Sequence, residues 1–280
     1  MNRVQFQPGL SMAEFLQLYG TEPLCRAAME QMRWPNGFRC PRCESDQCSR
    51  HERDRQTLWQ CSGCRYQTSV LAGTVFQASK LPLRTWFLAL HLLTQSKNNL
   101  SALALKRQLG VAYKTGWLIK HKLMDGMADR ESRRVLTGRV EIDDASLGGE
   151  RSGGKVGRGS ENKMPFVAAV QTNAKGHPLC ARFDPVAAFS GREIVGSGRK
   201  SVRHPNFRWV NTVPGNLKRA LSGTYHAFNF ATYARRHLAQ YTYRFNRRFD
   251  LKSLLPRLLN ICTKATPRCE QQIRLAEVWC

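Results

Sequence analysis

Four cysteines form the clearest candidate for chemistry in this 280-residue sequence. The segments FRCPRC and WQCSGC each hold two thiols in the spacing C-x2-C, and 17 residues separate the two pairs. This spacing is typical of a zinc ribbon. Four thiolates satisfy the tetrahedral preference of a structural Zn²⁺ ion and leave no open catalytic position. The sequence therefore predicts a structural zinc site made by Cys40, Cys43, Cys61 and Cys64.

The residues around these pairs suit a small ribbon, although a redox pair and a chance spacing are the alternatives. The segments LWQ and YQTSV beside the second pair predict short strands, and Pro41 and Gly63 suit the turns. Cys48 and His51 are spare ligands nearby, but four better placed thiols already complete the shell. Because a reducing cytosol disfavours disulfides, we expect buried or unreactive thiols at the other positions. These are Cys25, Cys48, Cys180, Cys262, Cys269 and Cys280.

A second candidate for chemistry is the acidic run in GRVEIDDASLGG, where an apolar strand ends in carboxylates. A glycine-rich turn and the basic loop ERSGGKVGRGSENK follow it. Hard cations such as Mg²⁺ take oxygen ligands, and a carboxylate at a strand end suits a metal site for phosphoryl transfer. The alternative is a solvated strand end. The segments PFVAAVQT and PLCARFDP predict the next two strands, so Asp143 lies on the first strand of three.

The stretch from Pro82 to Met127 has helical periodicity with two interruptions. The first helix ends at SKNN, Ser101 caps a second helix, and Gly110 ends the second helix before a third begins near Tyr113. This is the helix-turn-helix pattern, in which the last helix enters the major groove of DNA. The alternative is an ordinary helical hairpin with a charged outer face. The predicted DNA contacts on the third helix are Tyr113, Lys114, Thr115 and Lys120.

The charge of the chain indicates a polyanionic partner. The sequence has 44 Lys and Arg against 20 Asp and Glu, which gives a formal net charge of +24 and a pI near 10.3. No run approaches the roughly 18 apolar residues of a membrane span. The start MNRVQFQPGL lacks the basic-then-apolar order of a signal peptide. We expect a cytoplasmic, nucleoid-associated protein that does not enter a membrane.

The order of these motifs resembles a known family. The cysteine ribbon is followed by GTVFQASKLPLRTWFLAL, LGVAYKTGW, VEIDDASLGGE, WVNTVPGNLKRALSGTYH and YRFNRRFDL. This order resembles that of bacterial insertion-sequence transposases with an N-terminal zinc ribbon and a DDE domain, from about Phe15 to Val278. The resemblance implies a ribonuclease H-like catalytic domain, in which two aspartates and a third residue bind Mg²⁺ or Mn²⁺.

Two of the three family positions have a match in this sequence. Asp143 matches the first aspartate, and Asn211 matches the third position, where many members carry Glu. An amide oxygen still binds a cation, but it carries no charge and cannot act as a base. Some branches of the family nevertheless use Asn. The predicted catalytic residues are therefore Asp143 and Asn211.

The second aspartate of the family has no match. Between DPVAAFS and VGSGRKS the family has a helix and a strand that ends in an aspartate, and this chain has only Gly191 to Gly196 there. A crossover with its helix needs about 10 to 12 residues. Asp184 and Asp250 follow the acidic run, but neither lies at the catalytic position. The sequence therefore predicts an internally truncated domain, lacking a helix and a strand near 190–196, with impaired catalysis.

The C-terminal part of the chain is basic and aromatic. Arg244, Arg247 and Arg248 lie in YTYRFNRRF and are candidates for phosphate contacts. The aromatic residues of the same segment are expected to pack inward, which leaves the arginines outside. His226 in GTYH matches a family motif beside the active centre, and no role follows for it from the sequence.

The predicted fold class is multi-domain α+β: a zinc ribbon, a helix-turn-helix domain and a truncated ribonuclease H-like α/β domain. The expected function is that of a DNA transposase which binds terminal inverted repeats and target DNA as a homo-oligomer. The alternatives are a non-catalytic DNA-binding relic and a zinc-ribbon transcription regulator. The predicted segments are an N-terminal helical segment (1–35), the ribbon (36–78), the helix-turn-helix region (79–135), the DDE domain (136–250) and a basic tail (251–280).

Overall fold

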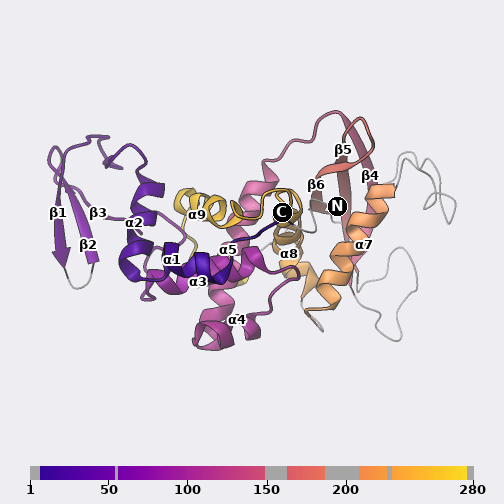
Figure 1. Cartoon of the computed structure of the whole chain (residues 1–280), viewed down its shortest axis with the longest axis horizontal. Coiled ribbons are helices and arrows are strands. Elements are labelled where there is room, and N and C mark those ends of the chain that lie inside the picture. The colour runs from indigo at the N-terminus through magenta and orange to yellow at the C-terminus, as the bar shows by residue number, and fades with distance from the viewer. Residues whose placement is uncertain (1–6, 54–55, 149–162, 187–207, 226–228, 276–280) are drawn as a thin grey trace.

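The computed structural model describes residues 7–53, 56–148, 163–186, 208–225 and 229–275. The molecule is elongated, with a small sheet at each end and helices between them (Figure 1). The predicted basic loop after the acidic strand, the segment near 190–196 and His226 lie outside the described residues. None of the described helices is both long and apolar enough to cross a bilayer.

Two short helices and the first sheet occupy the N-terminal end. Ser11 begins the first helix with a capping box, because its hydroxyl accepts from the Glu14 amide while the Glu14 carboxylate accepts from the Ser11 amide. The strands expected beside the second cysteine pair are present and pair antiparallel, and a further strand precedes them in the order β1-β2-β3. The elements are α1 (Met12–Tyr19), α2 (Glu22–Arg33), β1 (Cys48–Arg53), β2 (Gln56–Cys61) and β3 (Gln67–Ser69).

The three helices predicted in the middle of the chain are confirmed. They are α3 (Leu83–Gln95), α4 (Ala102–Leu109) and α5 (Tyr113–Ser132). Ser101 caps α4 by accepting from the Ala104 amide at 3.0 Å. Gly110 ends α4 in the left-handed conformation, with φ +66° and ψ +32°, which glycine adopts without steric cost. A Cβ at Gly116 would lie 3.2 Å from the Lys106 amide nitrogen, so α4 and α5 cross at close range.

The second sheet is an antiparallel meander in the order β4-β5-β6, which confirms the predicted run of three strands. Alternate residues of β5 are fully buried: Phe166, Ala168 and Val170. Two helices pack on this buried face, and α7 lies along the sheet in Figure 1. The elements are β4 (Arg139–Leu147), β5 (Met164–Thr172), β6 (Pro178–Pro185), α7 (Arg208–Ser222) and α8 (Phe230–Phe245).

The outer edge of β6 is closed by the segment that follows α8. The Asn246 side chain donates to the Ala181 carbonyl at 2.9 Å and accepts from the Ala181 amide at 2.7 Å. Arg248 donates to the carbonyl oxygen of Leu179 at 3.0 Å. These side chains supply the hydrogen bonds that a neighbouring strand would otherwise make.

Residues 251–275, which belong to the predicted basic tail, are helical and pack into the body of the protein. They form α9 (Leu254–Lys264) and α10 (Glu270–Leu275). Four leucines and Cys262 of α9 are buried in the same core as α1, α2, α3 and α5. The Val75 amide donates to the Cys262 carbonyl at 3.0 Å. The number of basic residues in the segment did not indicate this buried apolar face, because the lysine and arginine of α9 lie on the outer side of the helix.

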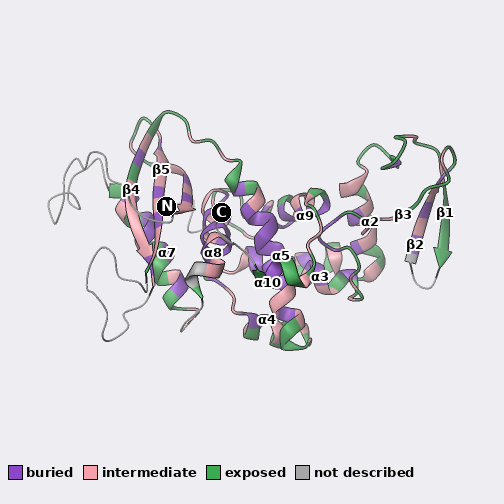
Figure 2. Cartoon of the chain, turned by 180° about the vertical axis from the view of Figure 1, so that it is seen from behind, coloured by how far each residue is buried: buried purple, intermediate pink, exposed green. Residues whose placement is uncertain are grey.

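The described residues form two hydrophobic cores that meet at α5 and α8. The first contains the N-terminal helices, the ribbon residues Trp59 and Val70, and α9. The second contains the β4-β5-β6 sheet with α7 and α8. Helix α8 enters both, because Leu238 belongs to the second core and Tyr243 to the first. Figure 2 shows buried residues concentrated in the helices at the centre of the molecule.

Replacing Leu258 by Ala is expected to destabilise the whole chain. Leu258 is fully buried in the first core, and emptying such a position costs about 2–5 kcal/mol through lost burial and a residual cavity. Denaturant unfolding of the zinc-loaded protein measures this loss. The control is Leu103→Ala on α4, where the side chain is 44% exposed and a change within about 0.5 kcal/mol is expected. Equal effects of the two substitutions would contradict a core position for α9.

Candidate metal and nucleic-acid sites

The four cysteines of the predicted zinc site converge at one end of the ribbon. Their sulfur atoms all lie within 4.8 Å of one another, and among the described residues no other cluster of three or more His, Cys, Asp or Glu side chains is close enough to hold a metal ion. The distances are 3.6 Å from Cys40 to Cys64 and 3.5 Å from Cys43 to Cys61. A tetrahedral ion with Zn–S bonds of 2.3 Å needs sulfurs about 3.8 Å apart. The site therefore fits a structural zinc ion.

Two tight turns hold the sulfur pairs. The Glu44 amide donates to the Cys40 carbonyl at 2.9 Å, and the Arg65 amide donates to the Cys61 carbonyl at 3.0 Å. Glu44 and Arg65 both adopt positive φ, near +60°, which lets the chain reverse directly after each pair. The backbone amide of Cys64 points at the Cys61 sulfur and lowers the pKa of that thiol to about 6. A thiolate is the form that binds zinc.

The ribbon is attached to α2 by side chains that the sequence does not single out. Arg26 donates to the Thr57 hydroxyl at 2.8 Å, and the ring centroids of Trp34 and Trp59 are 5.0 Å apart in edge contact. The spare ligands do not join the metal group, because the His51 ring bonds Ser49 at 2.9 Å. The ribbon and the N-terminal helices thus share one packed unit.

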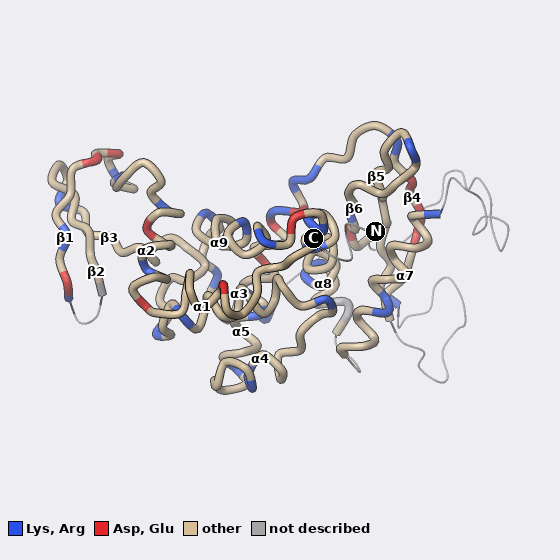
Figure 3. Tube along the Cα trace, in the orientation of Figure 1, with Lys and Arg blue, Asp and Glu red and all other residues tan. Residues whose placement is uncertain are grey.

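Asp143 lies on β4 with its side chain toward the face that the helices cover. It pairs with Ala168 of β5, whose side chain is fully buried on that face. The Asp143 carboxylate is half-buried and accepts from the Asp144 amide at 2.8 Å. Asp144 points to the opposite face, because successive residues of a strand alternate. Figure 3 shows the acidic run on β4 in a molecule whose basic residues are spread along its length.

Asn211 lies in the first turn of α7, which packs on β4 and β5. The sequence does not reveal the residue that joins these elements, Glu141. The Glu141 side chain is buried, and its Oε2 accepts from the amides of Trp209 at 2.8 Å and Val210 at 3.0 Å. The first turn of α7, with Asn211 directly after Val210, is therefore held on the strand that carries Asp143. The sequence feature that could have predicted this position is the alternation of side chains along the strand VEID, because it puts Glu141 on the same face as Asp143.

The two later aspartates lie elsewhere in the structure. Asp184 is on β6, which β5 separates from β4, and it forms an ion pair with Arg182 at 2.6 Å. Asp250 follows α8 and pairs with Arg257 at 3.5 Å. Neither residue is on the strand of Asp143.

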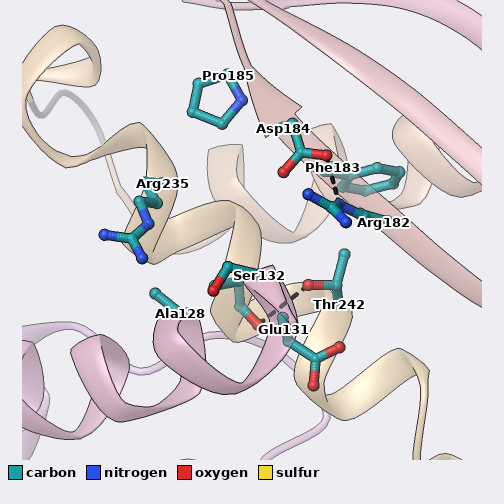
Figure 4. Close-up of a pocket in the computed structure, with 10 residues that line it drawn as sticks. Ala128, Glu131, Ser132, Arg182, Phe183, Asp184, Pro185, Arg235 and Thr242 are labelled. Atoms are coloured by element: carbon teal, nitrogen blue, oxygen red, sulfur yellow. Dashed lines mark hydrogen bonds and ion pairs between the residues drawn. The ribbon is translucent and has the colours of Figure 1, made fainter. Parts of the chain in front are cut away.

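A pocket of about 190 Å³ opens between α5, α8 and β6 (Figure 4), and its lining includes neither Asp143 nor Asn211. The Arg182–Asp184 pair and Arg235 lie around it. Arg235 forms an ion pair with Asp129 at 3.4 Å. Ion pairs therefore surround the pocket. The two hydroxyl groups in its lining, those of Ser132 and Thr242, donate to main-chain carbonyl oxygens and not to a base.

The predicted DNA contacts on α5 differ in exposure. Tyr113 is 53% exposed, the Lys114 side chain is 68% exposed, and Thr115 is half-buried. Lys120 is only 2% exposed, which does not fit the prediction that it contacts DNA. The reason is that this turn of α5 packs against α8 and the end of α7.

The three arginines predicted to contact phosphates bind the protein instead. Arg244 donates to the carbonyl of Ser96 at 2.8 Å and that of Asn98 at 2.7 Å. Arg247 is buried and pairs with Glu131 at 2.7 Å, while Arg248 donates to main-chain carbonyls of β6. These contacts do not fit the prediction of a DNA-facing arginine cluster. A guanidinium has several donors, so it also satisfies buried carbonyl oxygens.

Lys120 connects α5 to the end of α7. Its ammonium donates to the Tyr225 hydroxyl at 2.6 Å and lies 4.4 Å from the centre of the same ring. Burial lowers the pKa of Lys120 to about 7. Burial also lowers the pKa of His121, to about 2, and the charges of Lys120 and Arg236 lower it further. The junction of α5, α8 and the turn after α7 thus holds nitrogen bases whose pKa values are lowered by burial.

The short helix α10 covers part of the exposed face of α5. Glu270 forms an ion pair with Lys114 at 3.1 Å, and the Arg274 guanidinium lies 4.7 Å from the Trp117 ring centre. Ile273 is fully buried between them. The first turn of α5 therefore has one face against α10 and another toward solvent.

Comparisons with known proteins agree with this geometry. Residues 20–67 match the transposase zinc-ribbon domain, and residues 135–203 and 191–246 match the ISXO2-like transposase domain. The uncharacterized protein in transposable element ISH50 of Halobacterium salinarum is 32% identical over 170 residues. That alignment covers 55% of this chain and 56% of the relative, so the chain spans little more than half of it. No solved structure matches the chain.

The two domain matches together cover more than half of the chain, and the zinc ribbon precedes the transposase domain. The chain belongs to the insertion-sequence transposases that carry a zinc ribbon ahead of a DDE transposase domain. Within that class, its transposase domain is ISXO2-like.

Replacing Cys61 by Ser is expected to remove zinc and unfold the ribbon, because three thiolates no longer close the tetrahedral shell. Zinc content should fall from one ion per chain toward none, as measured by metal release from the purified protein. The matched control is Cys269→Ser, since Cys269 is exposed and outside the metal group. Full zinc occupancy in Cys61→Ser would contradict the four-cysteine site.

Lys120 should make the stability of the chain depend on pH. Its pKa is about 7 in the folded protein and about 10.4 in an unfolded chain, so the unfolded state binds more protons between these values. The free energy of unfolding, relative to that of Lys120→Met, is expected to rise from pH 7 to pH 10. Below pH 7 both states are protonated and the difference is constant.

Denaturant unfolding at several pH values measures this difference. Lys114→Met is the control, because Lys114 is exposed and its replacement should keep the wild-type slope. The same pH slope in the wild type and in Lys120→Met would rule out a strongly desolvated Lys120.

Proposed function

We propose that this chain is a DNA-binding insertion-sequence transposase whose ancestor cut and joined DNA strands with Mg²⁺, and which has itself lost most of that activity. One observation carries the proposal. The match to the transposase domain comes in two segments, 135–203 and 191–246, that overlap at residues 191–203, and the sequence has no aspartate between Asp184 and Asp250. This supports the prediction that the family's second aspartate is missing. The chain therefore keeps the family's DNA-holding parts and lacks one of its catalytic carboxylates.

A ribonuclease H-like fold is the interpretation that best accommodates the second core. Three consecutive antiparallel strands with helices on one face, and an aspartate on the first strand, are consistent with that fold. The predicted boundaries of the DDE domain, 136–250, include these strands together with α7 and α8. We propose the same boundaries, with α9 and α10 joining the N-terminal helical region.

The metal chemistry follows from the two oxygen ligands. Asp143 and Asn211 offer one carboxylate and one neutral amide, which suit a single Mg²⁺ or Mn²⁺ ion bound weakly. Two-metal strand transfer needs carboxylates that bridge ions about 4 Å apart and stabilise the attacking and leaving oxygens. The remaining ligands supply too little negative charge for that pair.

DNA binding is proposed for the ribbon and for the first turn of α5. The turn at Gly110 and the close crossing of α4 and α5 at Gly116 are consistent with a helix-turn-helix. Tyr113 and Lys114 would then face double-stranded DNA, namely terminal inverted repeats and target sites. A homo-oligomer on DNA in the nucleoid remains part of the proposal. A zinc-ribbon transcription regulator is disfavoured, because it would not need a transposase domain over residues 135–246.

The purified zinc-loaded chain is expected to bind inverted-repeat DNA and to cleave it little or not at all in Mg²⁺ or Mn²⁺. Lys114→Ala should weaken binding and reduce the salt dependence by about one counterion, because one phosphate contact is lost. Gel shift and strand-cleavage assays on the same labelled DNA measure both properties.

The controls separate binding from chemistry. Asp143→Ala should bind DNA as the wild type does, because Asp143 is on β4 and not in the ribbon or the first turn of α5, where DNA binding is proposed. Cys61→Ser should bind DNA less tightly. Efficient strand cleavage by the wild type that disappears in Asp143→Ala would show that the chain is an active transposase. Failure to bind any DNA would refute the proposed function altogether.

A further inference from the structure

We infer that Glu141 is a positioning residue which fixes α7 against β4, so that Asn211 and Asp143 share one cation site. The inference rests on the proposed metal role of Asp143 and Asn211. It adds a residue that binds no metal and is needed for the geometry of the two that do. No part of the resemblance to transposases assigns a role to Glu141.

The contact between Glu141 and α7 is a helix cap supplied from another element. The carboxylate Oε2 accepts from two successive amides, those of Trp209 and Val210, at 2.8 and 3.0 Å. The first amides of a helix have no partner within it, and the helix dipole favours a negative charge there. Caps of this kind usually come from the residue just before the helix, whereas Glu141 is 68 residues away in sequence.

The position of Glu141 on β4 gives the contact its functional consequence. Glu141 and Asp143 are two residues apart on one strand, so both side chains point to the face that α7 covers. Asn211 directly follows the second capped amide. A shift of α7 along the sheet would therefore change the separation of the Asp143 and Asn211 oxygens directly.

Two further hydrogen bonds of the first two turns of α7 go to elements other than β4. The Trp209 indole donates to the Gly176 carbonyl, at 2.5 Å, in the turn between β5 and β6. The Tyr241 hydroxyl of α8 donates to the Val213 carbonyl at 3.2 Å. These bonds fix the helix to the neighbouring turn and to α8. The Glu141 cap, in contrast, ties α7 to the strand of Asp143.

Burial of Glu141 distinguishes a positioning role from a ligand role. The side chain is 6% exposed, and its Oε2 already accepts two hydrogen bonds. A carboxylate engaged with two amides at a helix start is a poor donor to a cation, because the ion would have to compete with both N–H groups. Residues that orient metal ligands in this way change metal affinity by about 10- to 100-fold when replaced.

A double-mutant cycle on Mn²⁺ binding by the full zinc-loaded chain tests the inference. Asn211→Glu adds a carboxylate and is expected to tighten Mn²⁺ binding by about 10-fold or more over the wild type. The gain should disappear in Glu141→Asp and Glu141→Leu backgrounds, where the side chain is too short or cannot accept the amides. Glu141→Gln should keep most of the gain, since its amide oxygen still accepts both bonds. Titration calorimetry and Mn²⁺ electron paramagnetic resonance measure the affinities.

The controls address folding and metal ligation. Glu131→Gln removes a buried carboxylate that pairs with Arg247, so it is expected to destabilise the chain without altering Mn²⁺ affinity. Thermal unfolding of every variant identifies a loss that comes from misfolding. Because Glu141→Asp keeps the charge and most of the volume, it tests the cap even where Glu141→Leu does not fold.

Each outcome bears on the inference differently. An Asn211→Glu gain of equal size with and without Glu141 overturns the positioning role and leaves the metal site intact. A loss of Mn²⁺ in Glu141→Gln as large as that in Asp143→Ala makes Glu141 a ligand and also overturns the inference. Absence of Mn²⁺ binding in both the wild type and Asn211→Glu refutes the proposed metal site itself, and the inference with it.

Discussion

The packing of α5 against α8 is the interaction on which the rest of the molecule depends, because the two hydrophobic cores meet there. Buried charge pairs cross this interface: Arg236 with Asp125 at 3.0 Å, and Arg247 with Glu131 at 2.7 Å. An isolated buried charge is costly, whereas a pair with good hydrogen-bond geometry offsets much of its desolvation. Such pairs contribute little net stability. They nevertheless fix the register of the two helices, because displacement of one helix would leave both buried charges without a partner.

This arrangement explains the basic residues in the second half of the chain. The arginines of the α8 segment donate to Glu131 and to main-chain carbonyl oxygens of neighbouring elements. The net charge of +24 still favours a polyanionic partner, because ion pairs within the protein do not change it. What changes is the proposed location of the binding surface, for which exposed residues such as Lys114 and Tyr113 are the remaining candidates.

Sequence reasoning succeeded where a short stretch of chain carries the whole signal. The paired C-x2-C spacing predicted the cysteine cluster, Ser101 and Gly110 predicted both ends of α4, and the alternating segments predicted β5 and β6. In each case the determining contacts join residues close in sequence. The strand β1 was missed, because its polar residues CSRHER show no burial pattern and the strand depends on pairing with β2.

Sequence reasoning failed where the determining partner is distant. By its spacing, Lys120 follows the predicted DNA-contacting start of α5, yet it bonds Tyr225, 105 residues later. The capping role of Glu141 could not be predicted from the acidic strand alone, because the amides that it accepts from are 68 and 69 residues later in the sequence. The burial of α9 could not be predicted from the charge of the segment, because one face of the helix carries basic residues and the other carries leucines. The resemblance to a family made Asp143 and Asn211 candidates, but it did not predict the Glu141 cap that fixes α7 on the strand of Asp143.

The closed edge of β6 has a consequence for how the sheet can grow. A free strand edge is a template for pairing with another chain, and proteins cover such edges to limit self-association. Asn246 and Arg248 occupy the outer groups of β6, so an added strand cannot pair there without displacing them. Growth of the sheet is thereby directed to β4, and any strand that extends it will lie beside Asp143.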